Sequence, residues 1–265
     1  MTGETLPGRP GTLTPEQDEK LRIFWIAVLH VFGVIDHDQA HALNSTVHGI
    51  VPELTRKETT QSEKDAKKKK DKKSHGWFSR HKEEKSEDSQ LAEDKYGQTA
   101  QFKHALASMK PETMRKALWS MVKHDNPDAL LLRFLRARKW DVEKALVMMV
   151  STMHWRAEEM HVDDDIVING EEQMLIQSQS SDPVKKKFAE DFLAQVRTGK
   201  SYIHGEDYQG RPMCFVRVRL HHADDQGEEA QERYTVYIIE QARALLNPPV
   251  DTCVSRLVYS RANQC

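Results

Sequence analysis

The chain has 265 residues, of which 30% are charged and 38% hydrophobic, and its formal net charge is −2. Such a small net charge excludes a strong overall attraction to nucleic acid or to acidic membranes, so any such attraction must be local. The three cysteines lie at unrelated spacings, which excludes a disulfide framework and a cysteine-based metal site. Residues 1–20 are polar, and the apolar run at residues 23–35 is too short to span a bilayer. We therefore expect a cytoplasmic protein.

The start of the chain is predicted to be disordered over residues 1–13 and helical over residues 14–50. Thr14 can cap a helix, Pro15 suits its first position, and Gln17 completes a capping box. The apolar residues that follow share one broad face of this helix: Leu21, Phe24, Trp25, Val28, Val31, Phe32 and Ile35. The helix either docks onto a folded domain or lies in a membrane interface, although few Lys and Arg residues occupy its polar face.

Residues 51–98 are predicted to form a disordered, lysine-rich linker. Residues 64–73 contain seven lysines and two aspartates, a local charge of +5, and cannot bury enough apolar area to offset the entropy of ordering. One interpretation is a patch for anionic membranes or nuclear import, with Lys67, Lys68, Lys69, Lys70, Lys72 and Lys73 as candidate residues. The alternative is a solvated spacer without a binding role.

Residues 99–162 are predicted to form a compact helical bundle. Pro111 opens one helix, Asn126-Pro127 caps and opens a second that runs to about Lys139, and Asp141 caps a third. The links between these helices are short, as in helical bundles. The methionines on the apolar stripes are expected in the core and require no cofactor.

Residues 163–195 contain an acidic and a basic run and are interpreted as a connecting segment, and residues 196–265 as an αβ region. Two alternating segments, residues 201–204 and 213–220, predict strands joined by a turn. A helix from about Glu232 to Leu246 ends before two prolines, and residues 250–254 begin a third strand. From Cys253 onward we see no strand alternation and interpret the sequence as an unrelated tail.

Two motifs carry a resemblance to a known family. Residues 131–142 (LLRFLRARKWDV), followed by Trp155-Arg156, resemble the signature of the CRAL-TRIO N-terminal helical domain. Residues 207–212 (DYQGRP), which lead into a strand, resemble the hairpin that opens the lipid-binding domain of the same family. The N-terminal helix and the lysine-rich linker are similar to those of the fungal phosphatidylinositol-transfer branch. The resemblance covers about residues 100–253 and, more loosely, 14–35.

The resemblance implies an α+β or α/β fold in which a helical bundle precedes a CRAL-TRIO αβ lipid-binding domain, here incomplete. That domain holds one phospholipid in a cavity floored by a sheet and closed by a mobile helix. The family's counterpart of Arg138 helps to hold the lipid phosphate, which suits a planar guanidinium. Alternatively, Arg138 caps the carbonyls at the end of its helix. Arg133 and Arg136 are expected to be surface or interdomain charges.

The function implied by the resemblance is binding of phosphatidylinositol and its transfer between membranes, impaired here because the lipid-binding domain is truncated. The chain is then a monomer that contacts membranes transiently, binds no nucleic acid, and needs no metal or cofactor. The alternative is a non-catalytic interaction module for a protein partner or an anionic membrane. An enzyme is not expected, because the sequence has no phosphate loop, nucleophile elbow or zinc motif.

Overall fold

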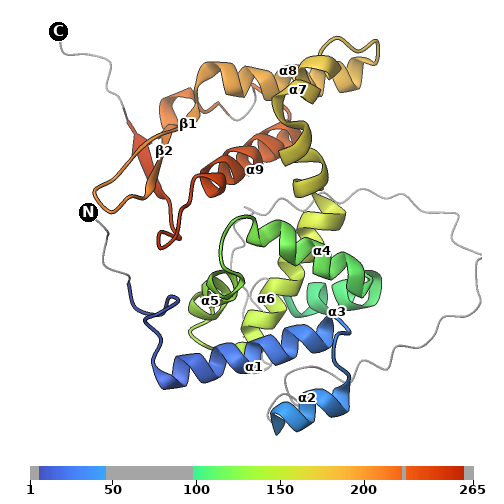
Figure 1. The fold of residues 1–265 in the computed structure, drawn as a ribbon. Coiled ribbons are helices and arrows are strands. Elements are labelled where there is room, and N and C mark those ends of the chain that lie inside the picture. Colours follow the sequence, from blue (N-terminus) through green and yellow to red (C-terminus); the bar gives the residue numbers. More distant parts are fainter. Residues whose placement is uncertain (1–5, 46–97, 223–224, 260–265) are drawn as a thin grey trace, which may run out of the picture.

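The computed structural model describes residues 6–45, 98–222 and 225–259 (Figure 1). The predicted linker, including its six candidate lysines, lies outside the described residues, apart from residue 98. The first helical part contains α1 (Pro15–Val31), α2 (His37–Leu43), α3 (Gln98–Ser108), α4 (Pro111–Val122), α5 (Pro127–Ala137) and α6 (Val142–His154). The chain continues through the π-helical turns η2 (Trp155–Glu159) and η3 (Val162–Val167) into α7 (Ile168–Gln177) and α8 (Pro183–Thr198). The remaining elements are β1 (Ser201–Glu206), β2 (Pro212–Arg217), the 3₁₀ turn η4 (Val218–Leu220), α9 (Glu228–Ala244) and β3 (Val254–Val258).

The predicted helix starts are confirmed. The Thr14 hydroxyl accepts a hydrogen bond from the Gln17 backbone N–H at 3.2 Å, and the Gln17 side chain accepts one from the Thr14 N–H at 3.1 Å. Asn126 caps α5 and Asp141 caps α6 through their side chains. The second bundle helix ends at Ala137, two residues earlier than predicted, because Lys139 and Trp140 adopt positive φ angles of 53° and 67°.

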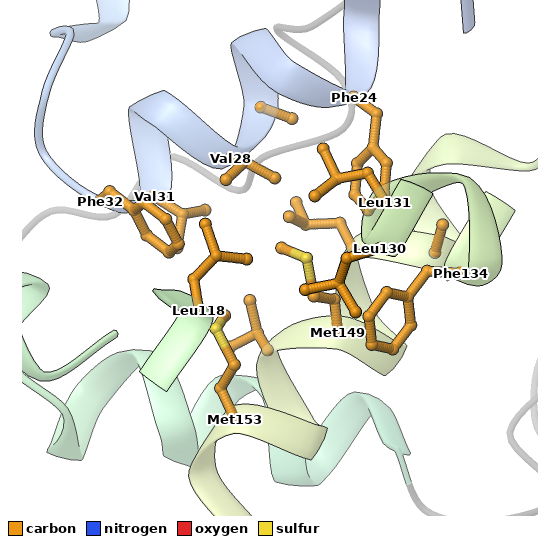
Figure 2. Close-up of a cluster of buried hydrophobic side chains, with 14 of the residues drawn as sticks. Phe24, Val28, Val31, Phe32, Leu118, Leu130, Leu131, Phe134, Met149 and Met153 are labelled. Atoms are coloured by element: carbon orange, nitrogen blue, oxygen red, sulfur yellow. The ribbon is translucent and has the colours of Figure 1, made fainter. Parts of the chain in front are cut away.

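The core of the helical part joins α1 to α3–α6 in one cluster of buried side chains. Figure 2 shows side chains of α1 (Phe24, Val28 and Val31) meeting those of α4, α5 and α6, among them Leu131 and Met149. Phe24, Leu131 and Met149 are fully buried. The apolar face of α1 therefore docks onto the bundle, as the first of the two interpretations predicts.

Residues 6–13 were predicted to be disordered, but the structure shows turns in this segment. The segment also contacts residues that are far away in the sequence. Gly8 is buried at φ +76°, and a Cβ at this position would lie 3.1 Å from the Trp140 ring. The Gly8 carbonyl accepts a hydrogen bond from the Arg136 guanidinium at 2.8 Å. These contacts are tertiary, so the local composition of glycine, proline and polar residues does not reveal them.

The connecting segment is helical. Its basic run lies in the first turns of α8, whose buried face packs against α9. A second cluster of buried side chains joins α7, α8 and α9. It consists of Met174, Ala189, Phe192, Leu193 and Tyr234, with Phe188, Val196, Tyr237 and Ile238 packed against them. The charged runs obscured a helical period in the sequence, since the apolar residues of α8 recur at intervals of three and four.

The sheet has the order β1-β2-β3, in which β1 pairs antiparallel with β2 and β2 pairs parallel with β3. The parallel pair is connected through α9, as a crossover requires. The second strand is shorter than predicted, because residues 218–220 turn into η4.

The third strand that was predicted to begin within residues 250–254 is present as β3, which begins at the last of these residues, Val254, and ends at Val258. The interpretation of the sequence from Cys253 onward as an unrelated tail was wrong for residues 254–258, because these residues pair with β2 in the sheet. Val250 donates a backbone hydrogen bond to the Asn247 carbonyl at 2.8 Å, so the chain still turns there. Because Ser255, Arg256 and Leu257 are all exposed, this strand lacks the alternation that marks a half-buried strand.

Candidate functional site

The two faces of the sheet differ in what lies against them. One face carries Cys214, which is buried, and Val216 of β2. α9 packs on this side, where the Tyr234 hydroxyl donates to the Ser201 carbonyl and accepts from its N–H, both at 3.0 Å. Burial raises the pKa of the Tyr234 hydroxyl above its ordinary value, which favours the neutral form that donates to Ser201.

The opposite face presents aromatic and cationic side chains. We define the aromatic sheet face by the residues that register and alternation place on it: Tyr202, Met213, Phe215, Arg217, Val254, Arg256 and Val258. Tyr202 and Phe215 stack with their ring centroids 5.3 Å apart and their planes at 12°. The Arg217 guanidinium carbon lies 5.3 Å from the centroid of the Tyr202 ring, within cation–π range.

All seven residues of the aromatic sheet face are half-buried or exposed. Their side chains combine apolar area for hydrocarbon with two guanidinium groups for an anion. This combination suits an amphipathic ligand that has an acyl chain and a phosphate.

Arg138 is the C-cap residue of α5. Its backbone N–H donates to the carbonyls of Phe134 and Leu135 at 3.0 and 3.2 Å, and its side chain is half-buried. Two residues earlier, Arg136 reaches the αβ part of the chain by pairing with Asp251 in the loop before β3. The expectation of an interdomain charge is therefore confirmed for Arg136, whereas Arg133 pairs within the bundle with Asp125 at 2.7 Å.

We call the ion pairs of Asp251 with Arg9 and Arg136 the Asp251 junction. It joins residues 6–13, which we call the N-terminal turn, to α5 and to the loop before β3. The Asp251 carboxylate accepts two hydrogen bonds from Arg9, at 2.9 and 3.0 Å, and one from Arg136. Its side chain is only 8% exposed, so the charge depends on these two arginines for compensation.

Replacing Asp251 with asparagine should lower the free energy of unfolding by about 1–3 kcal/mol, because both arginines lose their charged partner in a largely buried site. Hydrogen exchange at residues 6–13 should become faster, and mass spectrometry of peptic fragments measures it. The matched control is Asp38→Asn, since the side chain of Asp38 is fully exposed. Equal protection of residues 6–13 in Asp251→Asn and the parent chain would contradict the assignment.

The Glu240 junction connects the bundle to α9. The Glu240 carboxylate accepts hydrogen bonds from Arg156 at 2.8 and 3.2 Å and from Arg243 at 2.8 and 3.0 Å, and Lys123 lies 3.3 Å away. Asp163 accepts two further bonds from Arg156, and Arg243 donates to the Met121 carbonyl at 2.8 Å. Burial on its own raises the pKa of Glu240, but the bonds and charges of Arg156 and Arg243 outweigh it and lower the pKa to about 2.

Sequence reasoning missed the role of Arg156, although this residue ends the first motif. Its partner Glu240 is 84 residues away in the sequence. The sequence of α9 contains other glutamates as well, and nothing local identifies Glu240 as the one that pairs with Arg156. A charged residue in line with apolar residues of a helix is the signal that points to such a pair, because charges are rarely buried without a partner.

Two further kinds of feature, a metal cluster and a membrane-spanning helix, are absent from the described part of the chain. Among residues 6–45, 98–222 and 225–259, no group of three or more His, Cys, Asp and Glu side chains is placed to hold a metal ion. None of the described helices is long and apolar enough to cross a membrane.

Comparison with known proteins identifies two domains. Residues 98–151 match the CRAL/TRIO N-terminal domain, and residues 196–257 match the CRAL/TRIO domain. The second match extends to residue 257, and thus agrees with the position of β3 in the sheet.

The relatives of this chain include two fungal proteins. A CRAL-TRIO domain-containing protein of Schizosaccharomyces pombe is 35% identical over 257 residues, which cover 92% of this chain and 52% of that protein. The phosphatidylinositol transfer protein CSR1 of Eremothecium gossypii is 34% identical over 262 residues, which cover 95% of this chain and 58% of that protein. Patellin-5 of Arabidopsis thaliana is 26% identical over 167 residues, or 60% of this chain and 21% of its own length.

The chain therefore spans about half the length of the fungal relatives that it matches. Both domain matches occur in the expected order, on the helical bundle and on the αβ region respectively. Because two fungal relatives are similar to nearly the whole of this chain and both domains match, the chain belongs to the CRAL-TRIO family.

Proposed function

We propose that this protein binds a phospholipid of the phosphatidylinositol class and takes part in its transfer between membranes. The observation that carries the proposal is the aromatic sheet face, where Tyr202, Phe215 and Arg217 combine apolar area with a cation. The name of the relative from Eremothecium gossypii supports the choice of lipid. Transfer makes and breaks no covalent bond, so this role requires no nucleophile or general base.

In this proposal the acyl chains lie along the aromatic sheet face and Arg138 contributes to binding of the phosphate. A guanidinium can donate two parallel hydrogen bonds to a phosphate, and the half-buried position of Arg138 partly shields it from water. The lysines at residues 67–70, 72 and 73 would supply a local attraction to anionic membranes. The protein would act as a cytoplasmic monomer that contacts membranes transiently.

Because the described sheet has three strands and its aromatic face is partly exposed, a lipid on it would keep much of its hydrocarbon in water. We therefore propose weak binding by residues 1–265 alone, and expect this chain to be purified without stoichiometric phospholipid. Impaired transfer would follow from the same exposure.

A photoreactive phosphatidylinositol with the reactive group on an acyl chain tests the site. After irradiation, mass spectrometry of tryptic peptides should find the label within residues 201–217, and excess unlabelled phosphatidylinositol should suppress it. Arg138→Gln should weaken competition by phosphatidylinositol about 10- to 100-fold, because a charged hydrogen bond is lost. The matched control is Arg22→Gln, an exposed arginine on α1. Labelling that spares residues 201–217, or that phosphatidylcholine suppresses equally well, would contradict the proposal.

A further inference from the structure

The turn between α7 and α8 exposes apolar side chains. Leu175 and Ile176 lie in the last turn of α7 and are 46% and 60% exposed, and Val184 in the first turn of α8 is 76% exposed. The two helix ends are close together, because five residues join them and α7 packs against α8. We call residues 175–187 the hairpin tip.

The inner side of the same hairpin is anchored. Met174, Phe192 and Tyr234 are buried there, so the exposed residues of the tip are not needed for the cluster between α7, α8 and α9. α8 has 16 residues, which corresponds to a length of about 24 Å, and its other end leads into β1. Figure 1 accordingly shows the turn between α7 and α8 projecting from the molecule, at the end of α8 remote from the sheet.

The charge at the hairpin tip is positive. Lys185, Lys186 and Lys187 are all exposed, and Asp182 is the single acidic residue between residues 173 and 189. The Asp182 carboxylate accepts from the N–H groups of Val184 and Lys185 as the N-cap of α8, so it faces the backbone. Lys186 and Lys187 pair with Glu190 and Asp191, one turn further along the helix, and both lysines remain half exposed or more.

We propose that the hairpin tip is a docking surface for an anionic phospholipid membrane. The side chains of Leu175, Ile176 and Val184 enter the boundary between headgroups and acyl chains, while the three lysines contact lipid phosphates. Apolar side chains beside lysines are the combination that binds a bilayer surface, where burial and electrostatic attraction add together. This inference complements the proposed carrier function, but it does not require that the protein itself hold a lipid.

Cosedimentation of the full chain with vesicles measures docking. Binding to phosphatidylcholine vesicles that contain phosphatidylserine should exceed binding to phosphatidylcholine alone, and should decrease as salt increases. The variant with Lys185→Gln and Lys186→Gln should bind about fivefold more weakly for each lysine. The matched control is Lys103→Gln with Lys116→Gln, which removes the same charge from exposed positions of α3 and α4 and should not change binding.

A label at the tip separates this site from other basic segments of the chain. Val184→Cys, in a chain where Cys253 and Cys265 are replaced by serine, carries an environment-sensitive fluorophore whose emission should shift to the blue on anionic vesicles. The same label at Lys116→Cys should not shift. Bound protein with an unshifted label at position 184 would overturn the inference, and so would the absence of vesicle binding.

A second copy of the chain is the other occupant that the apolar residues could accept. A dimer in sedimentation velocity without vesicles, abolished by Ile176→Ser with Val184→Ser, would overturn membrane docking in favour of self-association. The labelling of residues 201–217 by photoreactive phosphatidylinositol tests the proposed function independently of membrane docking. A chain that is labelled there but does not dock through the tip would refute this inference and leave the proposed function intact.

Discussion

Replacing Glu240 with glutamine should lower the free energy of unfolding by about 3–5 kcal/mol, the range for removing one partner of a buried ion pair. Glu240 and Arg156 are only 5% and 6% exposed, and Arg243 and Lys123 share the same carboxylate. Without that carboxylate the guanidinium of Arg156 retains Asp163 alone. Urea unfolding followed by circular dichroism measures the change.

The pH dependence gives a second measurement of the same substitution. The pKa of Glu240 is lowered from 4.5 to about 2 in the folded chain, so its contribution to stability is complete above about pH 4.5 and is lost as the pH falls through 2. A shift of this size corresponds to about 3 kcal/mol. The stability curves of the parent chain and of Glu240→Gln should therefore converge at acid pH.

The control for this prediction is Glu190→Gln. Glu190 is 52% exposed and lies 3.9 Å from Lys186, so its replacement should cost less than about 0.5 kcal/mol. If Glu240→Gln is no more costly than Glu190→Gln, then the Glu240 junction does not hold the bundle to α9.

Phe24→Ala should destabilise the protein by about 3–5 kcal/mol, because it leaves a cavity in the cluster that joins α1 to the bundle. The side chain of Phe24 is fully buried, beside Leu131 in Figure 2. Thermal or urea unfolding in the absence of membranes gives the value.

Val34→Ala is the matched control, because Val34 follows α1 and is 54% exposed, so the change should stay within about 0.5 kcal/mol. The comparison also separates the two interpretations of the α1 face. A membrane-interface helix would leave stability in solution unchanged when Phe24 is truncated, whereas a docked helix requires the large loss.

The sequence was most informative where structure depends on neighbouring residues. Thr14 with Gln17, Asn126 before Pro127, and Asp141 each cap a helix through contacts within three residues, and all three starts were predicted. The predicted bundle and the two domains of the family followed from such local patterns and from the motif at residues 131–142.

The remaining features depend on distant contacts. The third strand is an exposed segment that pairs with β2, so its position follows from register and not from its own pattern. The sequence did not identify α7 and α8 as helices, because charged runs lie between the apolar residues that define the helical period. For the candidate site, alternation identified the faces of β2, but the stacking of Tyr202 on Phe215 required the pairing with β1.

The Asp251 junction has a consequence for the order in which the molecule is completed during translation. Arg9 leaves the ribosome well before its partner Asp251, which is 242 positions later in the sequence. At synthesis rates of about 5–20 residues per second, the N-terminal turn waits on the order of 10–50 s for the carboxylate that holds it. The bundle can pack during this interval, and the N-terminal turn becomes fixed only after the loop before β3 has been made.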